Sequence, residues 1–165
     1  MKTFLIYSIL FLVCFTTNSF AQLQTTSFEV LEKQQKYEPK NTLIFIQTNW
    51  CSYCHAMKKT TFKNNKIENL INEKYYFINF DAEEKHTITY LEKPFHYIPN
   101  GTKTGVHELA IHFSQENNPA SYPLILLINP QNQILFKHSG FLNAKELHEV
   151  LQYFSREKVQ ACKID

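Results

Sequence analysis

The segment Asn49–Met57, NWCSYCHAM, contains Cys51 and Cys54, two cysteines separated by two residues. Thiols at this spacing can act as a redox pair that opens and closes a small disulfide ring. Together with His55 they also spell C-x-x-C-H, the attachment signature of a c-type haem. The segment alone does not distinguish these two chemistries, so the surrounding sequence has to decide between them.

The bulk composition fits a single domain with its own core. The chain has 165 residues, of which 44% are hydrophobic, and this argues against disorder. The net charge of +2 is too small to indicate nucleic acid or an anionic surface as the main partner. Only three glycines are present, which argues against Gly-rich phosphate loops.

The first 21 residues have the pattern of a secretory signal. Lys2 supplies a positive charge, an apolar run follows over 4–15, and Ser19-Phe20-Ala21 places small residues where cleavage would occur. As a helix the run would span only about 18 Å, against a hydrocarbon core of about 30 Å. We therefore predict a signal peptide over 1–21 and a periplasmic or secreted mature domain over 22–165 without a membrane span. An uncleaved membrane anchor is the alternative.

Cleavage after Ala21 would remove Cys14 and leave Cys51, Cys54 and Cys162. A secreted protein meets a compartment that permits disulfides, but three cysteines cannot build a scaffold of several bridges. A closely spaced pair and one further thiol remain. Cys162 lies in the polar stretch beyond the last apolar helix face, and we expect it to take no part in the active site.

The apolar pattern beyond the signal predicts helices and strands in alternation, followed by a hairpin. The expected helices are Thr26–Tyr37, a segment from Cys51 that Asn64-Asn65 divides in two, Val106–Phe113, and Asn143 through Phe154. The expected strands are Thr42–Gln47, Tyr75–Phe80, Thr87–Leu91, Phe95–Ile98, Leu124–Ile128 and Ile134–His138. This order predicts an α/β fold in which helices flank both faces of a mixed β-sheet.

Local signals mark the ends of several of these elements. Thr26 with Glu29, and Asn143 with Glu146, have the spacing of helix capping pairs. A turn at Glu92-Lys93 would join the two short middle strands. The stretch 129–132, Asn-Pro-Gln-Asn, has good turn chemistry for the final hairpin.

Four features in chain order resemble the thioredoxin superfamily. A strand leads into Trp50-Cys51-x-x-Cys54, a helix begins at the first cysteine, and a second βα-type segment follows. Tyr122-Pro123 then stands directly before a hairpin, where the family places its cis-proline, and Gly140 matches a glycine common in the family. The stretch from Asn49 looks closest to secreted or periplasmic thioredoxin-like domains, including the carboxy-terminal domain of membrane disulfide-interchange reductases. The resemblance covers roughly 27–154.

The resemblance implies a thioredoxin fold and a thiol–disulfide oxidoreductase of the cell envelope. Cys51, at a helix N-terminus that favours its thiolate, would attack a client disulfide, and Cys54 would resolve the mixed disulfide. The residues expected to support the site or bind substrate are Trp50, His55, Tyr122 and Pro123. The implied partners are protein thiols or disulfides and an upstream redox partner. We expect a monomer that needs no cofactor and no metal.

Two departures from the family pattern stand out. Phe45 occupies the position, six residues before the first cysteine, where thioredoxins usually bury an acid, and Asn49 replaces an acid before Trp50. Proton transfer would then depend on water or on His55. In addition, the stretch 81–123 is longer than a minimal thioredoxin needs, which predicts a hairpin-like insertion around Ile88–Gly105, before the cis-proline.

Other interpretations of the cysteine pair remain open. Haem attachment would need a second axial ligand, and Met57 lies too close to His55 to reach the far face. A structural zinc site would need two more ligands, such as Cys162 and His138, whose spacing offers no support. The pair could also form a purely structural disulfide. Finally, the domain could be a non-catalytic thioredoxin-fold binding module, a reading that the loss of the acid at position 45 slightly favours.

Overall fold

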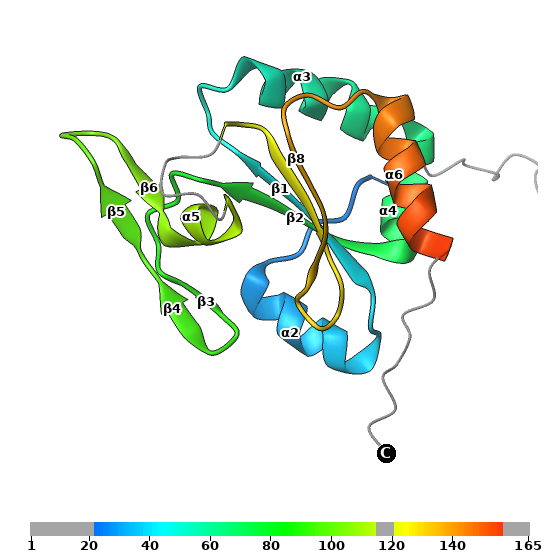
Figure 1. The fold of residues 1–165 in the computed structure, drawn as a ribbon, viewed down its shortest axis with the longest axis horizontal. Coiled ribbons are helices and arrows are strands. Elements are labelled where there is room, and N and C mark those ends of the chain that lie inside the picture. Colours follow the sequence, from blue (N-terminus) through cyan, green and yellow to red (C-terminus); the bar gives the residue numbers. More distant parts are fainter. Residues whose placement is uncertain (1–21, 115–120, 157–165) are drawn as a thin grey trace, which may run out of the picture.

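The computed structural model describes residues 22–114 and 121–156. The predicted signal peptide, its cleavage point after Ala21, Cys14 and Cys162 lie outside these ranges. Helices and strands alternate at first, two short hairpins and a helix follow, and the described chain ends with a further hairpin and a helix (Figure 1). The elements are α2 Phe28–Tyr37, β1 Asn41–Gln47, α3 Ser52–Lys59, η2 Thr61–Lys63, α4 Asn65–Lys74, β2 Tyr75–Asp81, β3 Ile88–Tyr90, β4 Lys93–Phe95, β5 Tyr97–Pro99, β6 Gly105–His107, α5 Glu108–Ser114, β7 Leu124–Ile128, β8 Ile134–Ser139 and α6 Ala144–Arg156.

The predicted mixed sheet is confirmed. Four strands pair in the order β2-β1-β7-β8, with β1 parallel to β2 and antiparallel to β7, and with β7 antiparallel to β8. Helices α2 and α5 cover one face, and α3, α4 and α6 cover the other (Figure 1). None of the helices in 22–114 and 121–156 is long and apolar enough to cross a membrane.

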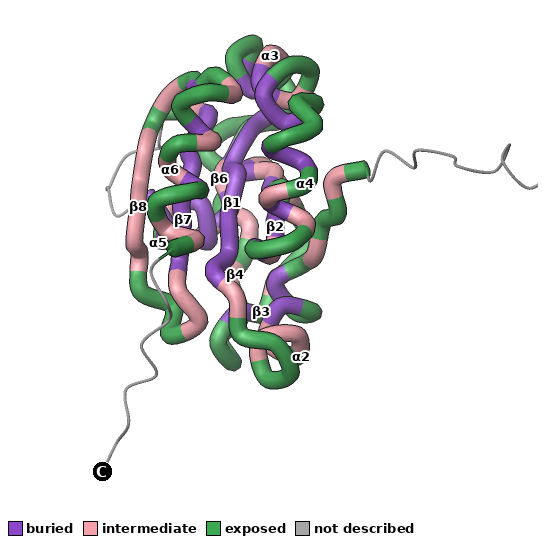
Figure 2. Tube along the Cα trace, turned by 90° about the vertical axis from the view of Figure 1, so that its right-hand side faces the viewer, coloured by how far each residue is buried: buried purple, intermediate pink, exposed green. Residues whose placement is uncertain are grey.

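The central strands are buried on both faces. All residues of β1 and β7 are buried, and Figure 2 shows β1 as a continuous buried strand through the centre of the molecule. Alternate residues serve opposite faces, so Ile44 and Ile46 join the cluster under α2 and α5, while Leu43 and Phe45 join the cluster under α3, α4 and α6. Double coverage explains why TLIFIQ and LILLI contain long apolar runs without a regular polar alternation.

The helix caps confirm one prediction and correct another. Asn143 accepts a hydrogen bond from the Glu146 amide at 3.1 Å, and the Glu146 carboxylate accepts one from the Asn143 amide at 2.9 Å. The predicted Thr26–Glu29 capping box is wrong, because Ser27 is the N-cap of α2 and its hydroxyl accepts from the Val30 amide. The Thr26 hydroxyl instead bonds to the side chain of Gln34 at 2.8 Å.

The stretch between β2 and α5 forms two hairpins, where the sequence predicted one hairpin followed by a helix from Val106. Strands β3 and β4 pair through a turn at Leu91-Glu92, not at Glu92-Lys93, because Lys93 already pairs with Tyr90. Strand β6 pairs with β5, so Val106 and His107 are extended and α5 starts at Glu108. Figure 1 shows both hairpins projecting from one side of the sheet, with α5 at their base. Their status as an insertion relative to other members of the family stays a prediction.

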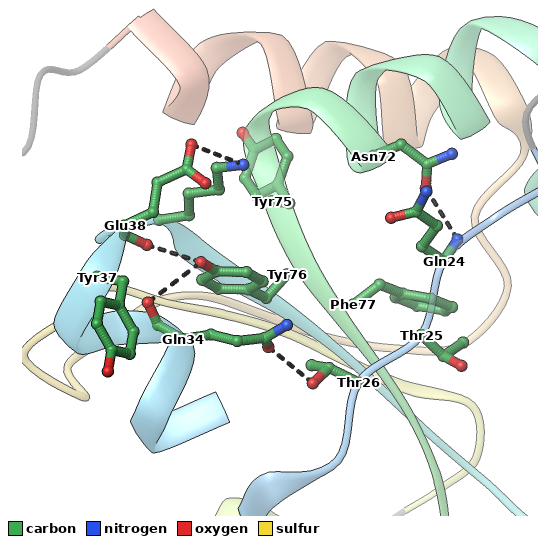
Figure 3. Close-up of a pocket in the computed structure, with 11 residues that line it drawn as sticks. Gln24, Thr25, Thr26, Gln34, Tyr37, Glu38, Asn72, Tyr75, Tyr76 and Phe77 are labelled. Carbon is green, nitrogen blue, oxygen red and sulfur yellow. Dashed lines mark hydrogen bonds and ion pairs between the residues drawn. The ribbon is translucent and has the colours of Figure 1, made fainter. Parts of the chain in front are cut away.

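The segment before α2 runs along the outer edge of β2. The Thr26 amide donates to the Phe77 carbonyl at 2.8 Å. The Gln24 amide donates to Asn72 Oδ1 at 2.9 Å (Figure 3). The Asn72 side-chain amide in turn donates to the Gln22 carbonyl at 3.1 Å. A hollow of about 370 Å³ beside these contacts lies at the start of β2, the opposite end of the sheet from the cysteines.

Candidate active site

The two cysteines lie where β1 leads into α3. After β1 ends, the chain turns through Thr48, Asn49 and Trp50, and the Cys51 amide donates to the Thr48 carbonyl at 3.2 Å. Cys51 is the N-cap of α3, and its Sγ accepts a hydrogen bond from the Cys54 amide at 3.0 Å. The two sulfurs form a disulfide, with the Cα atoms 5.2 Å apart.

The two sulfurs have different surroundings. Cys51 is 5% exposed, whereas Cys54 is fully buried in the cluster under α3, α4 and α6. Free amides and the helix dipole at the start of α3 favour a thiolate on Cys51. The apolar packing around Cys54 favours its neutral thiol. The pair is therefore asymmetric, because Cys51 keeps a small exposed area and Cys54 has none.

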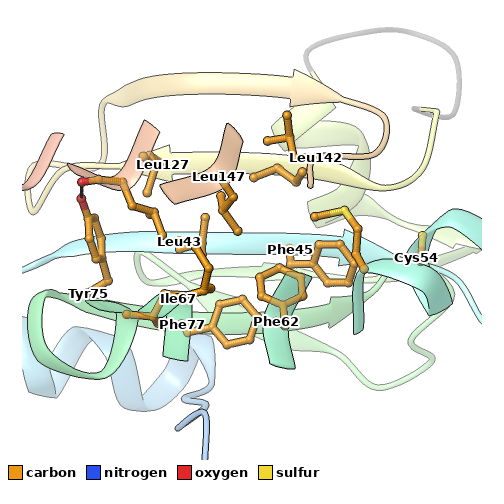
Figure 4. Close-up of a cluster of buried hydrophobic side chains, with 14 of the residues drawn as sticks. Leu43, Phe45, Cys54, Phe62, Ile67, Tyr75, Phe77, Leu127, Leu142 and Leu147 are labelled. Carbon is orange, nitrogen blue, oxygen red and sulfur yellow. Dashed lines mark hydrogen bonds between the residues drawn. The ribbon is translucent and has the colours of Figure 1, made fainter. Parts of the chain in front are cut away.

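Phe45 forms part of an aromatic wall behind Cys54. Its side chain is fully buried, and its ring meets the ring of Phe62 edge-on at 4.8 Å between centroids. Phe62 also packs on Phe77 at 5.1 Å. Figure 4 shows Phe45 and Phe62 side by side on the face of the sheet that carries Cys54. At position 45, where the resemblance implies a buried acid, this chain has the apolar ring of Phe45.

Trp50 and Tyr122 stand beside the pair. Trp50 is 69% exposed, its ring meets that of Tyr122 edge-on at 6.0 Å, and its indole N–H donates to Glu83 Oε1 at 3.1 Å. The Tyr122–Pro123 peptide bond is cis, and the Pro123 carbonyl accepts a hydrogen bond from the Gly140 amide at 2.8 Å. Gly140 has φ +117°, a conformation that favours glycine.

The turn before Cys51 is held by side chains from two directions. The Asn49 side-chain amide donates to Asp81 Oδ2 at 3.0 Å, and Asp81 Oδ1 accepts from the Glu83 amide at 2.9 Å. His55 Nε2 lies 2.8 Å from the Asn49 carbonyl. Because a carbonyl only accepts, Nε2 carries the proton in this bond. The His55 ring therefore braces the turn.

Asp81 and Glu83 are the site residues that sequence reasoning missed. Burial first, and then the charges of Glu83 and Asp81, raise the pKa of Tyr122 to about 12, so its hydroxyl stays protonated at neutral pH. The only signal in the sequence was the acidic run D-A-E-E after the second expected strand. Both acids share the end of the sheet with the cysteines because β1 and β2 are parallel, so Gln47 pairs with Asp81.

A pocket of about 420 Å³ adjoins Trp50. Its walls are Thr48, Trp50, Glu83 and Tyr122 on one side and Asn100, Thr104, Gly105 and Val106 of the β5–β6 hairpin on the other. Within 22–114 and 121–156, no three His, Cys, Asp or Glu side chains gather as ligands of a metal ion would. Cys162, considered above for such a site, lies outside these ranges.

Comparison with known proteins agrees with this geometry. Residues 28–155 match the family model of the thioredoxin-like domain. The structure is similar to that of the DsbH oxidoreductase, with 13% identity, 88% of this chain and 94% of that chain covered, and a TM-score of 0.61. A thioredoxin-fold protein from Helicobacter pylori is similar at 19% identity, with 74% and 73% covered and a TM-score of 0.54. The oxidised carboxy-terminal domain of Neisseria meningitidis DsbD is similar at 14% identity, with 79% and 98% covered and a TM-score of 0.51. A search of curated protein sequences found no match.

Proposed function

This chain belongs to the thioredoxin-like domain family, and from that premise we propose that it is a thiol–disulfide oxidoreductase that exchanges disulfides with protein clients through Cys51 and Cys54. The observation that carries the proposal is the asymmetry of the pair. Cys51 caps α3 and is 5% exposed, while Cys54 is fully buried one turn further along the helix. Nucleophile and resolving thiol need these two environments.

The exchange moves two electrons between the protein and its client. In the reducing direction, the Cys51 thiolate attacks one client sulfur, forms a mixed disulfide and releases the other client sulfur as a thiolate, which takes a proton from water. The Cys54 thiol then loses its proton, attacks the Cys51 sulfur and expels the second client thiolate. The protein ends oxidised and the client ends as a dithiol. The oxidising direction uses the same bonds in reverse.

The neighbouring residues support these steps. Pro123 has no N–H, and the Tyr122 backbone beside it can pair with an extended client segment. Trp50, whose ring meets that of Tyr122, would shelter the flank of the disulfide, and His55 holds the turn that ends at Cys51. Since Phe45 offers no carboxylate, water would take the proton of Cys54, or His55 would relay it.

We propose that the protein works in the periplasm or outside the cell, since the pattern over 1–21 is that of a secretory signal. Its partners would be protein thiols or disulfides together with an upstream redox protein that resets the pair. It would act as a monomer. Cys162 would take no part in the exchange.

Trapping of clients tests the roles of the two cysteines. Cys54→Ser should accumulate mixed disulfides with client proteins in cells, because Cys51 still attacks and nothing resolves the adduct. Cys51→Ser should trap none, and Cys162→Ser serves as the control that keeps full exchange activity. Equal trapping by the Cys54 and Cys51 variants would refute the assignment.

A non-catalytic binding module is the second candidate, favoured by the hydrocarbon wall at Phe45. The two candidates differ in the reactivity of Cys51. A redox enzyme predicts that reduced Cys51 is alkylated well below pH 8, while a binding module predicts alkylation only near the ordinary thiol pKa of about 8.5. Alkylation of the reduced protein across this pH range decides between them.

A further inference from the structure

The pocket beside Trp50 joins the redox site to the β5–β6 hairpin. Trp50 is the residue before Cys51, and its ring meets that of Tyr122, so one wall belongs to the surface where a client disulfide must dock. The opposite wall comes from Asn100, Thr104 and the start of β6. A client segment at Cys51 therefore passes the mouth of this pocket.

The pocket offers acceptors that nothing in the described chain satisfies. Thr48 is 1% exposed, and its hydroxyl has no hydrogen-bond partner within 22–114 and 121–156. Glu83 uses Oε1 to accept from the Trp50 indole, and its Oε2 has no partner in those ranges. A buried hydroxyl without a partner costs free energy, and it can accept or donate, whereas the carboxylate oxygen of Glu83 can only accept. A ligand group that donates can therefore satisfy both.

The charge on the pocket wall is negative, because Glu83 is the charged residue that lines it. Asp81 and Glu83 both lie close enough to Tyr122 to raise its pKa, and neither forms an ion pair with a cationic side chain of the described residues. None of the residues that line the pocket is cationic. The cations nearest to the pocket residues along the chain are Lys85 and Lys103, and both are exposed. The exposed ring of Trp50 adds a surface on which a guanidinium can stack.

We infer that this pocket binds a lysine or arginine side chain adjacent to the client's cysteine, and that Glu83 is the residue that selects it. The inference deepens the proposed disulfide exchange and rests on it. The cation would meet the free Oε2 of Glu83, the Thr48 hydroxyl would accept one of its N–H bonds, and the stem would lie along Trp50. Clients with an acidic residue at that position would be repelled by Glu83 and Asp81.

The test uses short peptides with one cysteine, linked as disulfide dimers, in which the residue before or after the cysteine is arginine, glutamine or glutamate. A compensating charge at the far end keeps the net charge constant. The reduced full-length protein is mixed with each dimer, and each rate is divided by the rate with dithiothreitol, so that differences in intrinsic disulfide reactivity cancel. We expect the arginine peptide to react roughly fivefold faster than the glutamate peptide at low salt, and the preference to shrink as salt is added.

Substitutions test whether Glu83 is the residue that selects a cationic client. Glu83→Gln keeps an acceptor for the Trp50 indole and removes the charge, so the arginine-to-glutamate ratio should fall at least roughly twofold, and Asp81 would account for any preference that remains. Glu84→Gln is the matched control, because Glu84 bonds to His86 and does not line the pocket, and it should keep the ratio. Thr48→Val should slow the arginine peptide more than the glutamine peptide.

The outcomes distinguish a failure of the proposed selectivity from a failure of the proposed disulfide exchange. Equal rates for all peptides with the unmodified protein, or a preference that Glu83→Gln leaves undiminished, would overturn the selection by Glu83 and leave disulfide exchange standing. A protein that reduces none of the peptides, while dithiothreitol reduces all of them, would overturn the proposed function itself.

Discussion

The central sheet and the two hairpins are built on different principles. All residues of β1 and β7 are buried, and helices cover both faces of the sheet. The strands of the hairpins have only three residues each, and β4 and β5 contain no buried residue. The hairpins attach to the domain through a few buried side chains, among them Tyr90 and His107.

Because of this difference, the sheet positions the reactive cysteines, whereas the hairpins shape the pocket proposed to recognise clients. The cysteines follow directly on β1, so their geometry depends on the sheet and the helices that cover it. The pocket beside Trp50 takes half of its wall from β5–β6, so its shape depends on the hairpin. Changes in the hairpins can therefore alter which clients fit without moving the two sulfurs.

The largest effect is expected at the sheet, from Phe45→Asp. The substitution removes a fully buried ring and places a carboxylate in its cavity, so we expect a loss of about 3–5 kcal/mol in the free energy of unfolding. Burial should hold the pKa of the new acid above its unfolded value. The loss should therefore grow as pH rises above about 4, where the unfolded chain ionises first.

Urea unfolding of Phe45→Asp and Phe45→Asn at pH 4.5 and pH 8 measures this effect, because asparagine matches the shape without the charge. The same acid should modestly speed disulfide exchange near neutral pH by taking the proton of Cys54. An unchanged rate in the folded variant would mean that His55 or water already handles this proton.

A smaller and more local effect is expected at the hairpin, from Gly105→Ala. A Cβ at this position would lie 2.4 Å from the Tyr97 ring and 2.5 Å from the Ile98 carbonyl, so β5 has to move, at a cost of about 1–3 kcal/mol. Gly101→Ala is the control, because its Cβ would meet only the Thr104 side chain, at 2.6 Å from the hydroxyl.

Hydrogen exchange reports where the cost of Gly105→Ala falls. Amides of β5 and β6 should exchange faster, whereas amides of β1 should keep their protection. If β1 loses protection as well, the hairpin unfolds together with the sheet in one cooperative unit, and the two regions are not independent.

The smallest expected effect is a pH dependence at the base of the hairpins. His107 is fully buried, accepts from the Leu109 amide through Nδ1 at 3.1 Å and lies 3.1 Å from the His86 carbonyl through Nε2. Burial lowers its pKa, while the His86 carbonyl and the charges of Glu108 and Glu84 partly oppose this shift, and His96 adds to it.

Stability should therefore fall as pH drops below about 6.5, because the unfolded chain then binds a proton that the folded His107 resists. His107→Asn can keep an acceptor near Leu109 and cannot titrate. The fall in urea midpoint between pH 7.5 and pH 5.5 should be smaller in this variant than in the unmodified protein. An equal fall would assign the pH dependence to other groups.

Sequence reasoning worked best where the structure is doubly covered. The predicted strand Leu124–Ile128 has the same bounds as β7, and β1 begins one residue before the predicted strand Thr42–Gln47. Both were found because a buried strand appears in the sequence as an apolar run between turn residues. The Asn143–Glu146 cap was also readable, since both partners lie within one turn of the helix.

The hairpins were harder to predict because their determinants are not local. Leu91 and Glu92 have φ values of 53° and 60°, a conformation for which neither residue has a preference, so the turn left no signal. The β5–β6 pairing depends on the close approach of Tyr97 to Gly105. The site residues Asp81 and Glu83 were missed for a similar reason, since only the parallel register of β1 and β2 brings them beside Trp50.

The contacts of the segment before α2 also bear on how the chain avoids aggregation. An uncovered edge strand invites a strand from another molecule, and β2 forms one edge of the sheet. The Thr26 amide donates a hydrogen bond to the Phe77 carbonyl on that edge, and Gln22 and Gln24 are both hydrogen-bonded to the Asn72 side chain. Cleavage after Ala21, as the sequence predicts, would make Gln22 the new first residue. The newly made terminus would then be anchored to the domain at once, and it would shield the β2 edge from neighbouring copies while the protein awaits its clients.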